Sequence, residues 1–253
     1  MKFAHRTITL LIVNAAIVVC PGCRSMPGYP KAGDEAARPD QVTDFQTLYK
    51  QNCSGCHGED GREGAAIALN NPAYLAYAGA ENLRAMTAQG MRGTLMPAFA
   101  QSGGGMLTDQ QVDALVQGML QTWGKPQEFA GLKLPPYASA AGDATSGQRA
   151  YAVACARCHG AEGTGTQNTT QAGAMQHSIV DASYLALVSD QSLRSIVVAG
   201  HPEKSAPDWR AYVAGRALTE PEINDIVAWI GAHRAAASAQ PGNEAGKAGK
   251  EAR

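Results

Sequence analysis

The pattern C-x-x-C-H occurs twice in this chain, and it constrains the fold more than any other feature of the sequence. Its members are Cys53, Cys56 and His57 in NCSGCHG, then Cys155, Cys158 and His159 in ACARCHG. Two cysteines at this spacing, followed directly by histidine, form the attachment site of c-type haem. The thiols bond to the two vinyl groups of the porphyrin, and the histidine reaches iron from the same side. The motifs therefore predict two covalently bound haem c groups, each with its iron.

Paired cysteines also form redox dithiols, and two such pairs together can form a zinc site. A redox dithiol does not need the following histidine, and a zinc site does not need a separate helical unit around each pair. A further C-x-x-C pair, Cys20 and Cys23, continues into Arg24 and lacks the haem pattern. Haem attachment therefore explains the two complete motifs better than either alternative.

The sequence around each motif is repeated as well, which indicates two similar structural units. The matching segments are LRAMTAQG (83–90) and LRSIVVAG (193–200), AYLA (73–76) and SYLA (183–186), and LTDQQVDALVQGML (107–120) and LTEPEINDIVAWI (218–230). Each copy is predicted to run in the order motif helix, middle helix, ligand loop and terminal helix.

Helix-start signals support this order. Ser or Thr followed three residues later by Glu or Gln forms a capping box, in which each side chain satisfies a free backbone N–H of the first turn. Four such pairs are predicted to begin the motif and terminal helices: Thr43/Gln46, Thr108/Gln111, Thr145/Gln148 and Thr219/Glu222. No alternating strand pattern of useful length is present. The expected fold class is all-α, with two helical domains in tandem, each enclosing one covalently attached haem c.

Each half of the chain resembles a class I cytochrome c domain, and the whole is similar to a tandem dihaem cytochrome c of a bacterial respiratory chain. The resemblance covers residues 43–124 and 145–234. It implies that a methionine from a late loop binds iron opposite the motif histidine. In the first half this is Met96, in the sequence LMPAF, so His57 and Met96 are the expected iron ligands.

The second half departs from the family pattern, because Ala206 stands where methionine is expected opposite His159. His201 lies on the same loop and is one candidate for the missing ligand. An open or water-bound iron is a second possibility, and Met175 or His177 is a third. Imidazole is a harder donor than thioether, so either of the first two arrangements predicts a lower potential for the second haem.

The N-terminus has the outline of a secretory signal, since Lys2 and Arg6 precede an apolar run. Residues 1–22 are expected to be removed, and Cys23 to become lipidated because the small residue Gly22 precedes it. Lipidation of Cys20, simple cleavage and an uncleaved anchor are the alternatives. We expect an exported protein, anchored by its lipid at the periplasmic side of a bacterial membrane.

The rest of the chain divides by composition and by the resemblance. The expected segments are an irregular tether (23–42), cytochrome c domain 1 (43–124), a Pro-, Gly- and Ala-rich linker (125–144), cytochrome c domain 2 (145–234) and a disordered tail (235–253). The charge is nearly balanced, at −1, and a nucleic-acid-binding domain would show a basic excess, so we expect no nucleic-acid partner.

Two classes of function fit these features. As an electron carrier, the protein would pass single electrons between a membrane-bound donor complex and a terminal oxidase or reductase. As an enzyme, it would be a dihaem peroxidase or sulfur-compound dehydrogenase, with the second haem as an open or His-ligated active site. A gas or redox sensor is a lesser alternative. The absence of a spare thiolate and of a convincing acid/base pair near the second loop favours the carrier over the enzyme.

Overall fold

The computed structural model of the chain describes residues 28, 37–138, 140–165 and 178–238. Residues 1–41 and 42–253 form two separate units, and the first contains a short 3-10 helix, η2 (Pro39–Gln41). The expected signal segment, with Cys20 and Cys23, lies outside the described residues. So do Met175, His177 and residues 239–253.

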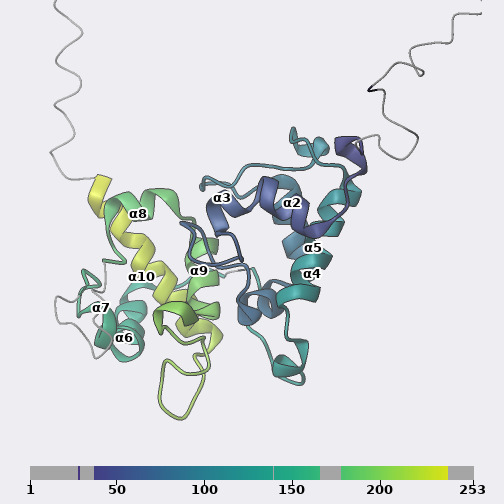
Figure 1. Cartoon of the computed structure of the whole chain (residues 1–253). Helices are drawn as coiled ribbons and strands as arrows, with labels where there is room; N and C mark the ends of the chain where they lie inside the picture. Colours follow the sequence, from purple (N-terminus) through teal and green to yellow (C-terminus); the bar gives the residue numbers. More distant parts are fainter. Residues whose placement is uncertain (1–27, 29–36, 139, 166–177, 239–253) are drawn as a thin grey trace, which may run out of the picture. The chain divides into compact units, whose positions relative to one another are not determined.

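The second unit contains both copies of the repeat, in the predicted order (Figure 1). The first copy comprises α2 (Phe45–Asn52), α3 (Ser54–His57), α4 (Pro72–Gln89) and α5 (Asp109–Trp123). The second comprises α6 (Ala144–Ala154), α7 (Ala156–His159), α8 (Ala182–Leu187), α9 (Asp190–Ala199) and α10 (Glu220–Ser238). Short 3-10 helices lie between them: η3 (Gln101–Gly103), η4 (Pro126–Phe129) and η5 (Pro202–Lys204). The described residues include isolated bridges but no strand, so the all-α fold is confirmed.

The predicted capping boxes are confirmed for the terminal helices and wrong for the motif helices. Thr108 and Thr219 exchange hydrogen bonds with the third residue beyond them, as predicted. At α2, however, Asp44 is the N-cap and accepts from the Thr47 N–H at 2.9 Å, and Asp143 has the same role at α6. A carboxylate is a strong acceptor and is favoured by the helix dipole, so the neighbouring aspartate takes the cap in preference to threonine.

The middle segment is interrupted at the same position in both copies. In the first, α4 consists of two helices joined across a kink at Gly79, whose backbone is not helical (φ 66°, ψ 166°). In the second, the corresponding stretch is divided into α8 and α9, because Val188 is extended and Ser189 caps a new helix. The prediction of one uninterrupted middle helix is therefore wrong for both copies: glycine allows the kink in the first, and Ser189 caps a new helix in the second.

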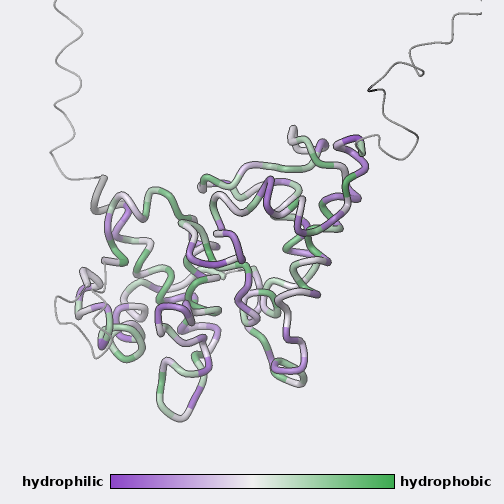
Figure 2. Tube along the Cα trace, viewed as in Figure 1, coloured by the Kyte–Doolittle hydropathy of each residue, from purple (hydrophilic) through white to green (hydrophobic). Residues whose placement is uncertain are grey.

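In each copy the terminal helix packs against the motif helix through aromatic rings. Trp123 of α5 contacts Tyr49 of α2, with ring centroids 5.1 Å apart. Trp229 of α10 contacts Tyr151 of α6 at 4.1 Å. Hydrophobic and hydrophilic residues alternate along the helices, as expected where each helix has one buried and one exposed face (Figure 2). The last helix continues to Ser238, so residues 235–238 are helical and not part of a disordered tail as predicted.

Candidate haem sites

The first C-x-x-C-H motif lies at the junction of α2 and α3. Cys53 ends α2 and precedes α3, which carries Cys56 and His57. The Tyr49 hydroxyl donates to the Gly58 carbonyl at 2.8 Å and so ties the end of the motif to α2. Burial raises the pKa of the Cys53 thiol to about 11, which suits a cysteine kept protonated and does not suit a reactive dithiol.

His57 is held as a metal ligand would be. It is 8% exposed, and burial lowers its pKa, so the ring is neutral. Its Nδ1 lies 2.8 Å from the Ile67 carbonyl, which accepts the Nδ1–H hydrogen bond. That bond places the free lone pair on Nε2 and fixes the orientation of the ring, which is the arrangement that orients histidine ligands of metals.

The second motif repeats this geometry with one difference. The Tyr151 hydroxyl donates to the Gly160 carbonyl at 2.7 Å, as Tyr49 does in the first copy. Burial raises the pKa of Cys155 to about 12 and lowers that of His159. The buried Nδ1 of His159 has no hydrogen-bond partner among the described residues, and residues 166–177 lie outside them.

The two ligand loops share one backbone hydrogen bond, and both return to the preceding helix. Met91 N–H donates to the Met96 carbonyl at 3.1 Å, and His201 N–H donates to the Ala206 carbonyl at 3.0 Å. Phe99 and Trp209, three residues beyond positions 96 and 206, each bond back to the preceding helix. Ala206 therefore occupies the structural position of Met96. Iron ligation by Met96 stays a prediction, as does ligation by His201.

Glycine is required where each loop leaves its helix. Gly90 and Gly200 have φ of 71° and 67°, a region that favours glycine. A Cβ at Gly90 would lie 2.7 Å from the Met96 carbonyl oxygen, and one at Gly200 would lie 2.2 Å from that of Pro207. The loop can thus fold back closely over the helix end in both copies.

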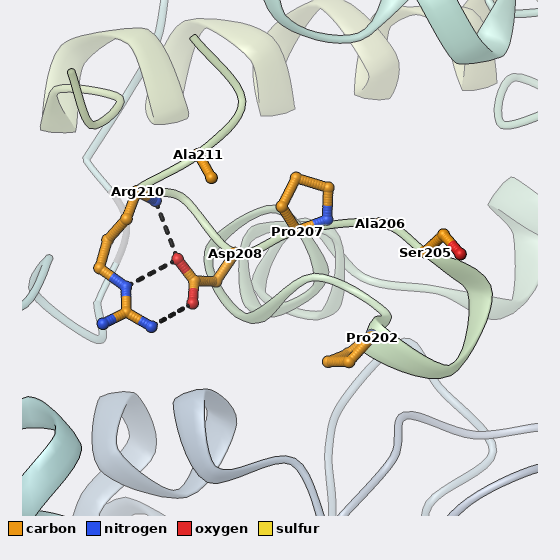
Figure 3. Close-up of a pocket in the computed structure, with 7 residues that line it drawn as sticks. All are labelled: Pro202, Ser205, Ala206, Pro207, Asp208, Arg210 and Ala211. Atoms are coloured by element: carbon orange, nitrogen blue, oxygen red, sulfur yellow. Dashed lines mark hydrogen bonds and ion pairs between the residues drawn. The ribbon is translucent and has the colours of Figure 1, made fainter. Parts of the chain in front are cut away.

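A hollow of about 480 Å³ lies along the second ligand loop (Figure 3). It is lined by Pro202, Ser205, Ala206, Pro207, Asp208, Arg210 and Ala211. Asp208 and Arg210 form an ion pair at 2.6 Å, and the Arg210 guanidinium also lies over the Trp209 ring at 5.3 Å.

Sequence reasoning missed Tyr212, which follows this loop. Burial is the main cause of the raised pKa of Tyr212. The charges of Cys155 and Asp208 raise this pKa further, which indicates that the Tyr212 side chain lies near the second motif. The two copies share no motif at this position, so the repeat offered no signal for Tyr212.

The donor set fits haem. Each motif brings together two thiols and a neutral histidine, on a short helix and the cysteine that caps it; His57 is buried and His159 is partly buried. Within the part of the chain that the structure describes, no group of three or more His, Cys, Asp or Glu residues could hold a metal ion, so the two cysteine pairs do not form a shared zinc site.

Comparison with known proteins agrees with this geometry. Residues 40–117 match the family model of subunit III of cbb3-type cytochrome c oxidase, and residues 144–233 match that of cytochrome c. The chain is a tandem dihaem cytochrome c of class I. Two covalently attached haem c groups, with their iron, are thus its cofactors, and electron transfer is its general role.

This dihaem cytochrome also matches a solved chain at low sequence identity. A solved chain from the reducing HAO-like protein complex of Kuenenia stuttgartiensis is 17% identical, with 78% of this chain and 99% of that chain covered. Its TM-score is 0.41, so the likeness supports no further conclusion. No curated protein matches the cytochrome.

Proposed function

We propose that this dihaem cytochrome is an electron carrier that passes single electrons between a membrane-bound donor complex and a terminal oxidase or reductase. The observation that carries the proposal is the presence, in one structural unit, of two complete attachment motifs whose histidines are neutral. The likeness of the first domain to subunit III of cbb3-type cytochrome c oxidase favours a respiratory partner.

The protein residues hold and tune the cofactors. Each haem supplies, when bound, an iron that gains or loses one electron. Cys53 and Cys56 provide the covalent attachment of the first haem, and His57 is kept neutral and oriented by the Ile67 carbonyl. Met96, which immediately precedes Pro97 in the ligand loop, is the proposed second ligand, and its soft thioether favours ferrous iron and so raises the potential.

We place the carrier at the periplasmic side of a bacterial membrane, held by a lipid on Cys23, or alternatively on Cys20. Cytochrome c domains are typically exported, which supports this location. The helices found in the described ranges do not include one with the length and hydrophobicity needed to span a bilayer. The lipid would bring the carrier close to membrane-bound partners.

For the second haem, we propose His201 as the iron ligand opposite His159. His201 and Ala206 form an antiparallel bridge with hydrogen bonds of 3.0 and 3.1 Å in both directions. Residues paired in this way direct their side chains to the same face, with Cβ atoms about 5 Å apart. The imidazole is therefore on the face of the loop to which the methionine of the first domain belongs.

Glu203 supports this proposal. Its Oε1 lies 3.1 Å from His201 Nδ1, a distance at which the carboxylate accepts the Nδ1–H. This bond leaves the Nε2 lone pair free and restricts the ring, as the Ile67 carbonyl does for His57. Ligands at both sides of both irons would suit a carrier, which needs no open coordination position.

One observation favours the enzyme alternative. Alanine cannot bind iron, and the hollow beside Ala206 is large enough for a small molecule (Figure 3). If the second iron is open, a peroxide or a small sulfur compound could reach it, and the second haem would be an active site.

Carbon monoxide separates the two functions, because it binds rapidly to reduced haem iron only where a coordination position is open. We expect no rapid binding to the fully reduced wild-type protein and binding to half of the haems in His201→Ala. Met91→Ala is the matched control, since Met91 has the same loop position in the first domain, and it should behave like wild type. Rapid binding to half of the haems in wild type would reject the His201 ligand and support the enzyme. Thioether absorption bands from both haems would point to Met175 instead.

A further inference from the structure

Arg194 of α9 is fully buried, and no carboxylate in the described part of the chain forms an ion pair with it. It is 0% exposed. Its Nε and Nη2 atoms donate to the Pro136 carbonyl at 3.2 and 2.8 Å, and Nη1 donates to the side-chain oxygen of Asn224. Among the residues described, none of the ion pairs includes Arg194. The guanidinium is therefore neutralised by no acid there, and the linker carbonyl is its main acceptor.

The equivalent arginine of the first domain, in contrast, is paired with carboxylates. This arginine, Arg84, is partly exposed and forms ion pairs with Asp113 at 2.6 Å and Asp109 at 3.2 Å. The repeats align Asp113 with Asn224. The second domain has thus exchanged a carboxylate for an amide. A buried cation is costly unless hydrogen bonds satisfy it, so the Pro136 carbonyl is energetically important at this position.

The segment that supplies this carbonyl also contacts the first domain. Tyr137 packs on Tyr77 of α4 with ring centroids 5.2 Å apart, and its carbonyl accepts from the Tyr77 hydroxyl at 3.0 Å. The Tyr137 hydroxyl lies 2.7 Å from the sulfur of Met86, also on α4. The same Tyr137 carbonyl accepts from Gln191 of α9 at 2.9 Å. Residues 136 and 137 therefore bond to both domains at once.

Two further contacts bring the linker and the first domain against the second domain near its ligand loop. Phe129 is 6% exposed and stacks on Trp209, with centroids 6.4 Å apart. Asn71, the buried N-cap of α4, donates to the Ala199 carbonyl at 2.9 Å, at the end of the helix that leads into the second loop. Most residues of the linker predicted from composition are exposed, but Phe129, Pro136 and Tyr137 contact the domains on either side of it.

We propose that residues 129–137 form an interdomain clamp, held by Arg194, that keeps the two haem domains in one fixed arrangement so that electrons pass between the haems within a single molecule. Arg194 is a positioning residue in this account. The rate of transfer between two haems depends on their separation and orientation, which a fixed interface keeps constant. This clamp rests on the proposed electron-transfer role, and it adds to that role the transfer of electrons between the two haems of one molecule.

The test compares Arg194→Met with Arg84→Met in the haem-loaded protein. Methionine keeps much of the arginine volume and removes the donors, and apolar replacement of buried charges is often tolerated, so folding should survive. Gln191→Ala removes the bond to the Tyr137 carbonyl at a half-buried site and serves as the second, milder variant. The readouts are the distance distribution between the two ferric irons by pulsed electron resonance and the interhaem rate after rapid one-electron reduction.

We expect one narrow distance distribution and one interhaem rate in wild type and in Arg84→Met. Arg194→Met should broaden the distribution and slow the transfer, with the absorption spectrum of each haem unchanged, and Gln191→Ala should do the same to a smaller extent. A folded Arg194→Met or Gln191→Ala protein with wild-type distances and rate would overturn the clamp, as would equal broadening in Arg84→Met. These outcomes are separate from the carbon monoxide result, which tests the carrier proposal without reference to the distance between domains.

Discussion

Replacing Cys53 and Cys56 with alanine is expected to give a protein that carries one covalently bound haem instead of two. The Cys155→Ala/Cys158→Ala variant should likewise keep one haem, at the first motif. The reason is chemical: each pair of thiols forms the two bonds to one porphyrin, and the motifs lie on separate helices. The measurement is the mass of the intact protein, made together with a cytochrome c maturation system.

Removal of one haem should also destabilise the domain that loses it. Each domain is small, and burial of protein surface alone leaves little margin at that size, so the porphyrin is part of the core. The matched control is Cys20→Ala/Cys23→Ala, which alters the cysteine pair without a following histidine and should keep both haems. Haem that extracts from the wild-type protein into acidified organic solvent would show that attachment is not covalent.

Met96→Ala should change the first haem alone, and by a large amount. Loss of the thioether removes the ligand that favours ferrous iron, so the potential of this haem should fall. Axial ligands contribute to a range of about 0.8 V among haem proteins, so a fall on the order of 0.1 V or more is expected. The far-red absorption band of thioether-bound ferric iron should disappear at the same time, and optical spectra during a redox titration measure both effects.

The exposed residue Met106 provides the control for this experiment. It is 83% exposed, so Met106→Ala should keep the far-red band and both potentials. A far-red band that survives in Met96→Ala would show that another residue binds the first iron.

The sequence predicted the fold class and the order of elements because the signals for them are local. A haem motif lies within five neighbouring residues, and a helix-start signal within four. The same locality explains the errors at α2 and α6: aspartate and threonine both offer caps, and their relative strength decides which one begins the helix.

The contacts of Arg194 could not be predicted in this way. Its partners, Pro136 and Asn224, lie 58 and 30 residues away along the chain. The repeat does show that Asp113 is matched by Asn224, but this difference gains meaning only when the packing of the linker over Arg194 is known. The pairing of positions 96 and 206 was predictable, because Gly, Pro and an aromatic residue keep the same spacing in both loops.

If one chain carries two haems with different iron ligands, the two haems should have different reduction potentials. A redox titration of the wild-type protein, followed by optical spectra, measures both potentials. We expect two separate one-electron waves, with the far-red thioether band changing in the higher-potential wave and no such band in the lower one. A single wave of two equivalent haems, or a thioether band in both waves, would show that the two irons do not have different ligands.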